Sequence, residues 1–345
     1  MRTGNIAAAL FLLATVGAAF TPVIYATPTR GFLSTRGTSI VDSAGQAIVL
    51  RGVNYPGYEQ DHPDLHNSMA YSTFAGNEFN VVRLPLSWAN LEPQLGAFNS
   101  EYLSSHVDQD VQWAKSAGIY VILDMHQSDW AGRFGGEGAP DWMVENYAAN
   151  VTGMRHAASD FWSNTNLQDH LVQVWVKIAQ HYANEPTIAG YDLFNEPWIF
   201  TSVIPGLNAT RALEGFYVRT IQAVRAVDPN HIIFLEPGSV KMFNLPISNI
   251  VWAPHFYPLA FAPKFYLDNY TFLENDFIAK YQTCLIDYGT PMWIGEFGAF
   301  MPDNSSRAIW LQVALDLFNR YGIGWGWWSY DGQYTSIPDQ LYIPS

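Results

Sequence analysis

Two glutamates stand where a hydrophobic run gives way to a loop. Glu196 lies in GYDLFNEPWIF, residues 190–200, and Glu296 lies in PMWIGEFG, residues 291–298. A carboxylate is costly to bury, and Pro197 ends the hydrogen-bond ladder of a strand directly after Glu196. Two carboxyl groups that converge on a cleft can hydrolyse a glycosidic bond, if one is protonated and the other ionised. An apolar or like-charged setting favours the protonated form, and a cationic or donor-rich setting favours the ionised form.

Other polar and aromatic residues also follow the ends of apolar runs. They are Asn54, Arg83, Asp124, His126, Asn195, Glu236, His255, Tyr257 and Trp328. For Asn54, Asp124 and Glu236, each taken alone, we expect a capping or barrel-rim group with no chemical task. Glu236 in FLEPG resembles Glu196 in FNEPW only superficially.

Metal chemistry and serine chemistry are alternatives for such a site. His126 and His255 could be metal ligands, with Asp124 nearby in DMH, and catalytic zinc sites usually recruit three protein ligands. The chain has no clustered HxH or HExxH pattern, so we expect neither a catalytic metal nor a cofactor. It also has no G-x-S-x-G elbow, which argues against a serine nucleophile.

The elements that would position these residues alternate in type. Strands are predicted within residues 48–55, 79–88, 119–127, 188–197, 231–238, 249–258, 291–298 and 322–331. Amphipathic stretches between them predict helices, among them 101–118 with Gly118 as its stop, 167–184, 212–230 and 305–322. Eight apolar strands that alternate with helices predict an α/β fold, a (β/α)8 TIM barrel with a parallel sheet. In such a barrel strands four and seven, which carry Glu196 and Glu296, face one another across the mouth.

The two ends of the chain depart from a plain barrel. A short β-hairpin is predicted after residue 31, with turn chemistry at Asp42, Ser43 and Gly45. Only about fifteen residues follow the eighth strand, so the eighth helix is predicted to be shortened. We expect the tail and the hairpin to cover the final groove. The absence of a linker favours one domain over residues 31–345, and the absence of a glycine-rich loop argues against dinucleotide binding.

Composition narrows the partners. The chain carries 31 Asp and Glu against 17 Lys and Arg, a net charge of -14, which argues against nucleic acid as a partner. Charged residues make up 14%, below the roughly 25% of ordinary soluble domains, so an uncharged substrate fits better than an anionic one. The only cysteine is Cys284, so no intrachain disulfide can form. We expect a monomer.

Residues 1–26 have the pattern of an export signal. Arg2 supplies the positive region, the run IAAALFLLATVGAAF the apolar region, and Ala26 a small residue for cleavage. The alternative is an uncleaved anchor, but the apolar run falls short of the ~20 residues that span a bilayer. We expect a secreted, extracellular protein whose only membrane contact would be this segment if it is kept.

The order of the motifs resembles glycoside hydrolase family 5. DLFNEP and IGEFG resemble its two signature segments, and VVRLPLSW, DMHQ, HFY and WWSYD resemble its supporting motifs in the same order. The resemblance runs from about residue 31 over nearly the whole remaining chain. It implies a retaining β-glycosidase in which Glu196 is the general acid/base and Glu296 the nucleophile.

The same resemblance implies the supporting roles. Asn195 would hydrogen-bond the sugar 2-hydroxyl, and Arg83 would keep Glu296 ionised. Tyr257 would donate to the nucleophile, with His255 beside it, and His126 would line the adjoining subsite. Trp328 would be the aromatic platform for a sugar ring, with Trp327 as the competing candidate.

Members of this family act on many substrates, and a fold does not choose among them. An endo-β-1,4-glucanase is the first expectation. The loop DMHQSDWAGRFGGEGAPDWM resembles the endoglycoceramidase branch, which makes an endoglycoceramidase-like or other β-glycosidase the runner-up. A catalytically inactive carbohydrate-binding barrel is a third possibility, disfavoured because both carboxylates and their supporting residues are present.

Overall fold

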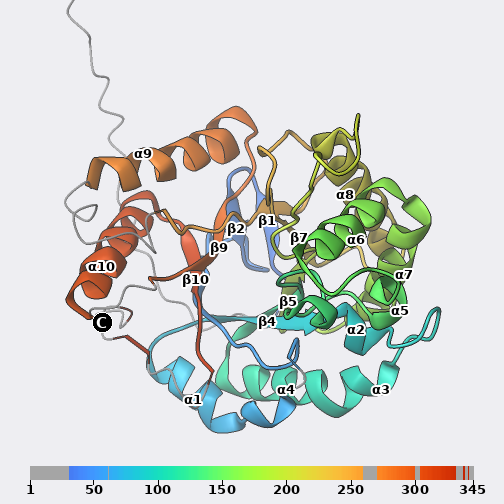
Figure 1. Cartoon of the computed structure of the whole chain (residues 1–345). Coiled ribbons are helices and arrows are strands. Elements are labelled where there is room, and N and C mark those ends of the chain that lie inside the picture. The colour runs from blue at the N-terminus through green and yellow to red at the C-terminus, as the bar shows by residue number, and fades with distance from the viewer. Residues whose placement is uncertain are drawn as a thin grey trace, which may run out of the picture.

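The barrel predicted from the sequence is present. The computed structural model describes residues 31–60, 62–258, 270–299, 304–331, 337, 338 and 341, so the expected export signal lies outside the described residues. Eight parallel strands surround one axis (Figure 1). They are β3 (Arg51–Asn54), β4 (Val81–Ser87), β5 (Tyr120–His126), β6 (Ile188–Asp192), β7 (Ile232–Leu235), β8 (Ile250–Trp252), β9 (Trp293–Phe297) and β10 (Gly324–Trp327).

The sheet closes between β8 and β9. Hydrogen-bonded neighbours run β8-β7-β6-β5-β4-β3-β10-β9, and two parallel bridges, Trp252–Met292 and Phe256–Phe297, join the two end strands. Every predicted strand is therefore found, although each is shorter than the apolar run that predicted it.

Helices surround the sheet. They are α1 (Ser68–Gly76), α2 (Trp88–Leu91), α3 (Ser100–Tyr102), α4 (Asp108–Ala117), α5 (Asp141–Val144), α6 (Val151–Ser163), α7 (Thr165–Tyr182), α8 (Ala209–Arg225), α9 (Tyr270–Tyr281) and α10 (Asn304–Tyr321). A π-helical segment, Leu103–Val107, joins α3 to α4, and Gly118 ends α4 with a left-handed φ of 73°, as predicted. The connection from β7 to β8 contains no helix in the described residues. Among the described helices, none is both long and apolar enough to cross a membrane.

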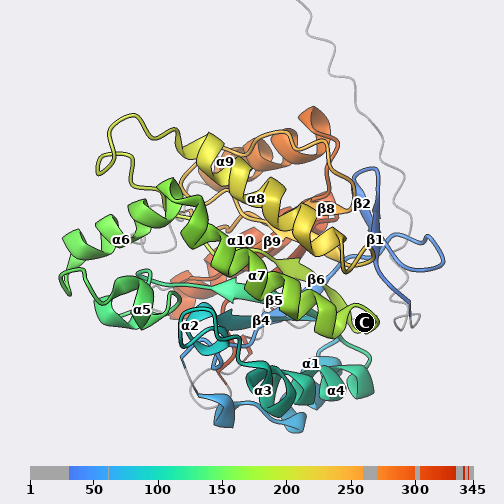
Figure 2. The ribbon, with the colours of Figure 1, turned by 90° about the vertical axis from the view of Figure 1, so that its right-hand side faces the viewer.

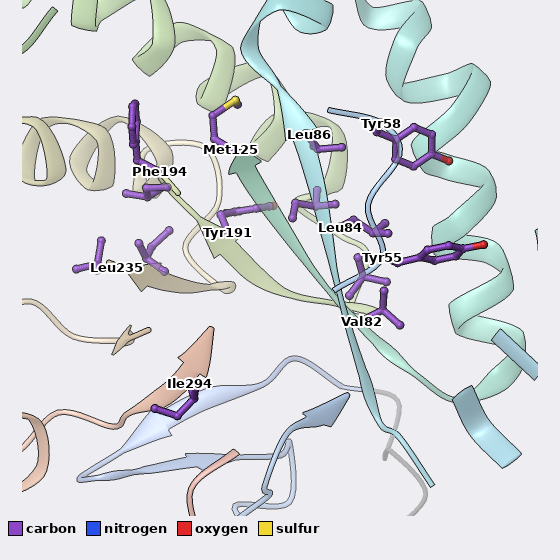
Figure 3. Close-up of a cluster of buried hydrophobic side chains, with 14 of the residues drawn as sticks. Tyr55, Tyr58, Val82, Leu84, Leu86, Met125, Tyr191, Phe194, Leu235 and Ile294 are labelled. Carbon is purple, nitrogen blue, oxygen red and sulfur yellow. The ribbon is translucent and has the colours of Figure 1, made fainter. Parts of the chain in front are cut away.

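The alternation of side chains along β4 shows how the core and the site share one strand. Val82, Leu84 and Leu86 point from β4 into the hydrophobic layer between sheet and helices (Figure 3). Val81 belongs to a second cluster inside the barrel. Because side chains alternate with a period of two, Arg83 points into the barrel on the same side as Val81. The inner cluster is therefore the floor on which the polar site stands.

The N-terminal hairpin lies at the end of the barrel opposite α5 and α6 (Figure 2). It comprises β1 (Ser34–Arg36) and β2 (Ser39–Val41), so its turn is at Gly37 and Thr38. The turn chemistry predicted at Asp42, Ser43 and Gly45 is confirmed in the following turn, where the Asp42 carboxylate accepts from Ala44 N and Gln46 N and Val41 pairs antiparallel with Ala47.

The hairpin does not cover the final groove. Leu33 and Ile40 pack in the cluster inside the barrel, and Thr35 N donates to Asn249 Oδ1 at 2.9 Å just before β8. The expectation for the hairpin is therefore wrong. For the tail it is supported, because Ile337 and Leu341 are buried in the core between sheet and helices.

Candidate active site

Arg83 is the centre of the polar network at the barrel mouth. Its guanidinium is fully buried. Nη1 donates to Glu296 Oε1 and Asn54 Oδ1, each at 2.9 Å. Nη2 lies 2.8 Å from Glu236 Oε1 and 2.9 Å from Asn195 Oδ1. Ion pairs with Asp124 and Asp192, both at 2.9 Å, complete the shell around the cation.

Glu296, on β9, has a hydrogen-bond donor at each of its two carboxyl oxygens. Its Oε1 accepts from Arg83 and its Oε2 accepts from the Tyr257 hydroxyl at 2.9 Å. Burial and the neighbouring Glu296 charge raise the pKa of Tyr257 well above its usual range, so the phenol keeps the proton that it donates. This is the cationic, donor-rich setting that a nucleophilic carboxylate needs.

Glu196 follows β6 and remains partly open, with 39% of its side chain exposed. Its Oε1 lies 2.9 Å from His255 Nδ1. Burial alone would raise the pKa of Glu196, but the hydrogen bond and charge of His255 outweigh it and lower the pKa to about 2. His255 therefore outweighs the apolar or like-charged setting that was expected to keep the acid protonated.

His255 is shared among three carboxylates. Nδ1 lies 2.9 Å from Glu196 Oε1 and 3.4 Å from Glu296 Oε2, and Nε2 lies 3.1 Å from Glu236 Oε1. Burial opposes its charge, but these acids raise its pKa well above the usual value. Both ring nitrogens then carry a proton, because each faces a carboxylate oxygen.

A cleft of about 750 Å³ opens above the two glutamates. His126, Asn195, Tyr257 and Trp328 line it, and the Trp328 ring lies parallel to the His126 ring at 5.1 Å. Trp327 instead is buried in the core, so Trp328 is the cleft tryptophan. Burial lowers the pKa of His126 to about 4, and its Nδ1 lies 2.7 Å from Asp124 Oδ2. The structure thus brings all eight proposed site residues together.

Three residues expected to be simple rim or capping groups belong to this network. Asn54, Asp124 and Glu236 are all buried and all contact Arg83, so that expectation does not describe their environment. The sequence does not predict a role for Asp192, which contacts Arg83, or for Gln127, whose Nε2 donates to Asn195 O and Glu196 O. Asp192 sits within the apolar run GYDLF, where its inward direction could have been read from the period of two.

The sequence also does not predict an apolar wall of the cleft beside Glu196. It is formed by Trp130, Met154, Ala158, Trp198 and Phe200, from the loop after β5, from α6 and from the loop after β6. Trp198 also contributes to the low pKa of the Glu196 side chain and is 52% exposed. No local pattern marks this wall, since it depends on how three separated segments converge.

Two groups of side chains in the described residues have the spacing of metal ligands. Asp124, Asp192 and Glu236 form one, and Glu196, His255 and Glu296 the other. The first group surrounds the Arg83 guanidinium, which already supplies the positive charge. In the second, His255 uses both nitrogens toward carboxylates, which suits a protonated ring and not a ligand.

Comparison with known proteins gives a consistent result. The family model described as Cellulase (glycosyl hydrolase family 5) matches residues 41–333. Endoglycoceramidase I of Rhodococcus hoagii is 27% identical over 261 residues, 65% of this chain and 52% of that protein. The major extracellular endoglucanase of Xanthomonas campestris pv. campestris is 25% identical over 339 residues, 85% of this chain and 63% of that protein.

Solved structures agree on the fold. A crystal structure of endogalactoceramidase superposes with a TM-score of 0.71 at 27% identity, over 87% of this chain and 74% of that chain. The chain spans about half the length, 52%, of the R. hoagii endoglycoceramidase.

Proposed function

The chain belongs to glycosyl hydrolase family 5, and from this premise we propose that it is a retaining β-glycoside hydrolase that acts by double displacement. One observation supports this most strongly. Single oxygens of Glu196 and Glu296, with a His255 nitrogen, lie within 4.8 Å of one another. Retaining enzymes place their carboxyl groups about 5–5.5 Å apart, whereas inverting enzymes need about 6.5–9.5 Å to admit a water.

In the first step Glu296 attacks the anomeric carbon as the bond to the leaving oxygen breaks, and Glu196 gives that oxygen a proton. Arg83 and Tyr257 donate to the two oxygens of Glu296 and hold the carboxyl group in place for this attack. A bound aglycone would cover the exposed part of Glu196, and loss of water raises a carboxyl pKa toward the protonated form. In the second step Glu196 takes a proton from water, which attacks the sugar and frees Glu296.

The substrate class has two candidates. The leaving group must lie beside the acid, and the wall of Trp130, Met154, Ala158, Trp198 and Phe200 makes that side of the cleft apolar. An apolar aglycone, such as the lipid of a glycosphingolipid, fits this wall, and similarity to an endoglycoceramidase points the same way. An endo-β-1,4-glucanase is the second candidate, supported by the endoglucanase relative.

An activity panel tests both levels of the proposal. Purified protein is incubated with carboxymethylcellulose, lichenan, mannan, xylan, aryl β-glycosides and a glycosphingolipid, and proton NMR follows the anomer released first. We expect β-configured product. Initial release of the α-anomer would contradict retention, and no turnover of any β-glycoside would contradict the activity.

The apolar wall has its own test. Trp198→Ala should lower kcat/KM on a glycosphingolipid by tenfold or more, since burying a large aromatic side chain against an apolar ligand contributes about 1.5–3 kcal/mol. Because Trp198 also contacts Glu196, the change should be compared with that on an aryl glycoside with a good leaving group. An equal loss on both would favour the glucanase.

We further propose that the protein is exported, on the pattern of residues 1–26. Recovery of the protein from culture medium and sequencing of its N-terminus test this. A protein that stays inside cells with residues 1–26 attached would contradict it.

A further inference from the structure

Glu236 is a buried carboxylate with no step of its own in the proposed reaction. It follows β7 directly, next to β6, the strand that precedes Glu196, and only 1% of it is exposed. Among the described residues that line the cleft, Glu236 does not occur. Its side chain therefore acts on other protein groups and not on the sugar.

The first of these groups is the backbone of Glu196. Glu236 Oε2 accepts from Glu196 N at 2.7 Å. Glu196 has a φ of 41°, in the left-handed region that residues other than glycine rarely adopt. Such a conformation persists only where its surroundings impose it, and residues of this kind cluster at functional sites.

The residues after Glu236 continue the contact. Ser239 N donates to Pro197 O at 3.2 Å, and Ile199 N donates to Ser239 Oγ at 2.9 Å. Gly238 has a φ of 53°, and a Cβ there would lie 2.3 Å from Pro197 O. Residues 236–239 and 196–199 thus lie against one another as two closely packed loops, which we call the acid-loop clamp.

The second group is the side chain of Glu196, reached through His255. Glu236 Oε1 lies 3.1 Å from His255 Nε2, and His255 Nδ1 lies 2.9 Å from Glu196 Oε1. Glu236 Oε1 also accepts from Arg83 Nη2 at 2.8 Å. Both oxygens of Glu236 therefore accept from donors, which favours the ionised form, whereas burial outweighs this and raises the pKa of Glu236 to about 8.

We propose that Glu236 is the positioning residue for the acid/base glutamate. It fixes the backbone of Glu196 directly and orients the Glu196 carboxyl group through His255. This proposal rests on the proposed function, because it gives Glu236 a purpose only if Glu196 moves the proton.

Glu236→Gln tests it with the least change in shape. The glutamine side chain keeps one acceptor oxygen, but its N–H group then faces one of the groups that Glu236 holds, which are Glu196 N, Arg83 Nη2 and His255 Nε2. Loss of that contact loosens the acid-loop clamp. Proton donation matters most for a poor leaving group. The kcat/KM for a 4-methoxyphenyl β-glycoside should therefore fall on the order of tenfold further than that for the 2,4-dinitrophenyl glycoside. Added azide, which needs no general base, should restore turnover of the dinitrophenyl glycoside in the variant.

Asp192→Asn is the matched control. Asp192 is also fully buried and contacts Arg83 at 2.9 Å, but in the described part of the chain it forms no hydrogen bond to Glu196. Asp192→Asn should lower kcat/KM by a similar factor for both glycosides, and added azide should not restore turnover. If Glu236→Gln behaves in the same way, Glu236 acts only through Arg83 and the proposal is overturned.

Two further arms keep the test decisive. If Glu236→Gln does not fold, Ser239→Ala loosens the acid-loop clamp outside the charge network. Its kcat/KM should show the same dependence on the leaving group, with a smaller difference between the two glycosides. Equal losses of kcat/KM on both glycosides would overturn the proposal.

Wild-type protein must first cleave a dinitrophenyl β-glucoside, β-galactoside or β-cellobioside. Its failure on all three counts against the proposed function, whereas an unselective variant of an active enzyme counts only against Glu236.

Discussion

Arg83 carries the charge balance of the barrel mouth. Its buried guanidinium faces the carboxylates of Asp124, Asp192, Glu236 and Glu296. Removing one member of such a buried group leaves an uncompensated charge, which typically costs about 3–5 kcal/mol. Substitutions in this network therefore change stability and turnover together. Leaving-group dependence, azide rescue and pH dependence separate the two effects.

The low pKa of Glu196 predicts an acid-sensitive contribution to stability. A carboxyl whose pKa falls from 4.5 to about 2 on folding stabilises the protein above the unfolded value and loses that effect as pH falls through the folded value. The free energy of unfolding in urea should thus decrease between about pH 5 and about pH 3. Glu196→Gln, whose amide oxygen can still accept from His255, should show a smaller decrease. Equal decreases in the free energy of unfolding of both proteins would refute the low pKa of Glu196.

For single residues, the sequence identifies those whose side-chain orientation follows from their position along a strand. Glu196, Glu296 and Arg83 interrupt apolar runs, so their burial at the barrel mouth could be predicted. The partner of Glu236 could not, because the Glu196–Glu236 contact depends on two loops that only the folded barrel brings together. For the same reason the place of Trp198 in the cleft could not be predicted, because it depends on the packing of the loop after β6 beside α6.

Among the elements, β3 depends on a close approach to β4. The Cβ of an alanine at Gly52 would lie 1.7 Å from Val81 O, so a side chain there pushes the two strands apart. Overpacking of this kind usually costs about 1–3 kcal/mol. We expect Gly52→Ala to lower the free energy of unfolding by at least that amount, measured by urea titration.

Gly76→Ala in α1 is the control. Apart from the neighbouring residues and backbone of the helix itself, no atom lies within 4 Å of the added Cβ, and alanine suits a helix better than glycine. This variant should be as stable as the wild type or slightly more stable. A Gly52→Ala protein of wild-type stability would show that β3 and β4 pack less closely than described.

The sequence predicts where elements occur better than where they end. The run 188–197 predicts a strand, but β6 stops at Asp192. The chain then turns toward the positive φ of Glu196, which no alternation of apolar residues reveals. The helix α1 was not predicted, since it is short and buries only Ala70, Tyr71 and Phe74. Tertiary packing, which a local pattern does not contain, stabilises such helices.

Over the whole molecule, the barrel is filled from one end and open at the other. The hairpin and the inner cluster close the end opposite the cleft, and the tail contributes Ile337 and Leu341 to the core around the sheet. Leu341 is only 1% exposed, although no α-helix follows β10 in the described residues. The tail therefore covers part of the sheet that an eighth helix would otherwise cover.

Leu341→Ala tests this role of the tail. Truncating a buried leucine typically costs about 2–5 kcal/mol, so the free energy of unfolding should fall by an amount in that range. Leu95→Ala removes the same atoms from a residue that is 62% exposed and should change stability by less than about 0.5 kcal/mol. Equal small effects would mean that the tail does not contribute to the core.

Trapping the glycosyl-enzyme intermediate identifies the nucleophile directly. A 2-deoxy-2-fluoro glycoside with a good leaving group, carrying a sugar that the enzyme cleaves, is incubated with wild-type protein and with Glu296→Gln. Peptide mass spectrometry then locates the attached sugar. We expect the sugar to be attached to Glu296 in the wild type and the variant to be unlabelled. A sugar on any other residue of the wild type would contradict Glu296 as the nucleophile of a double displacement.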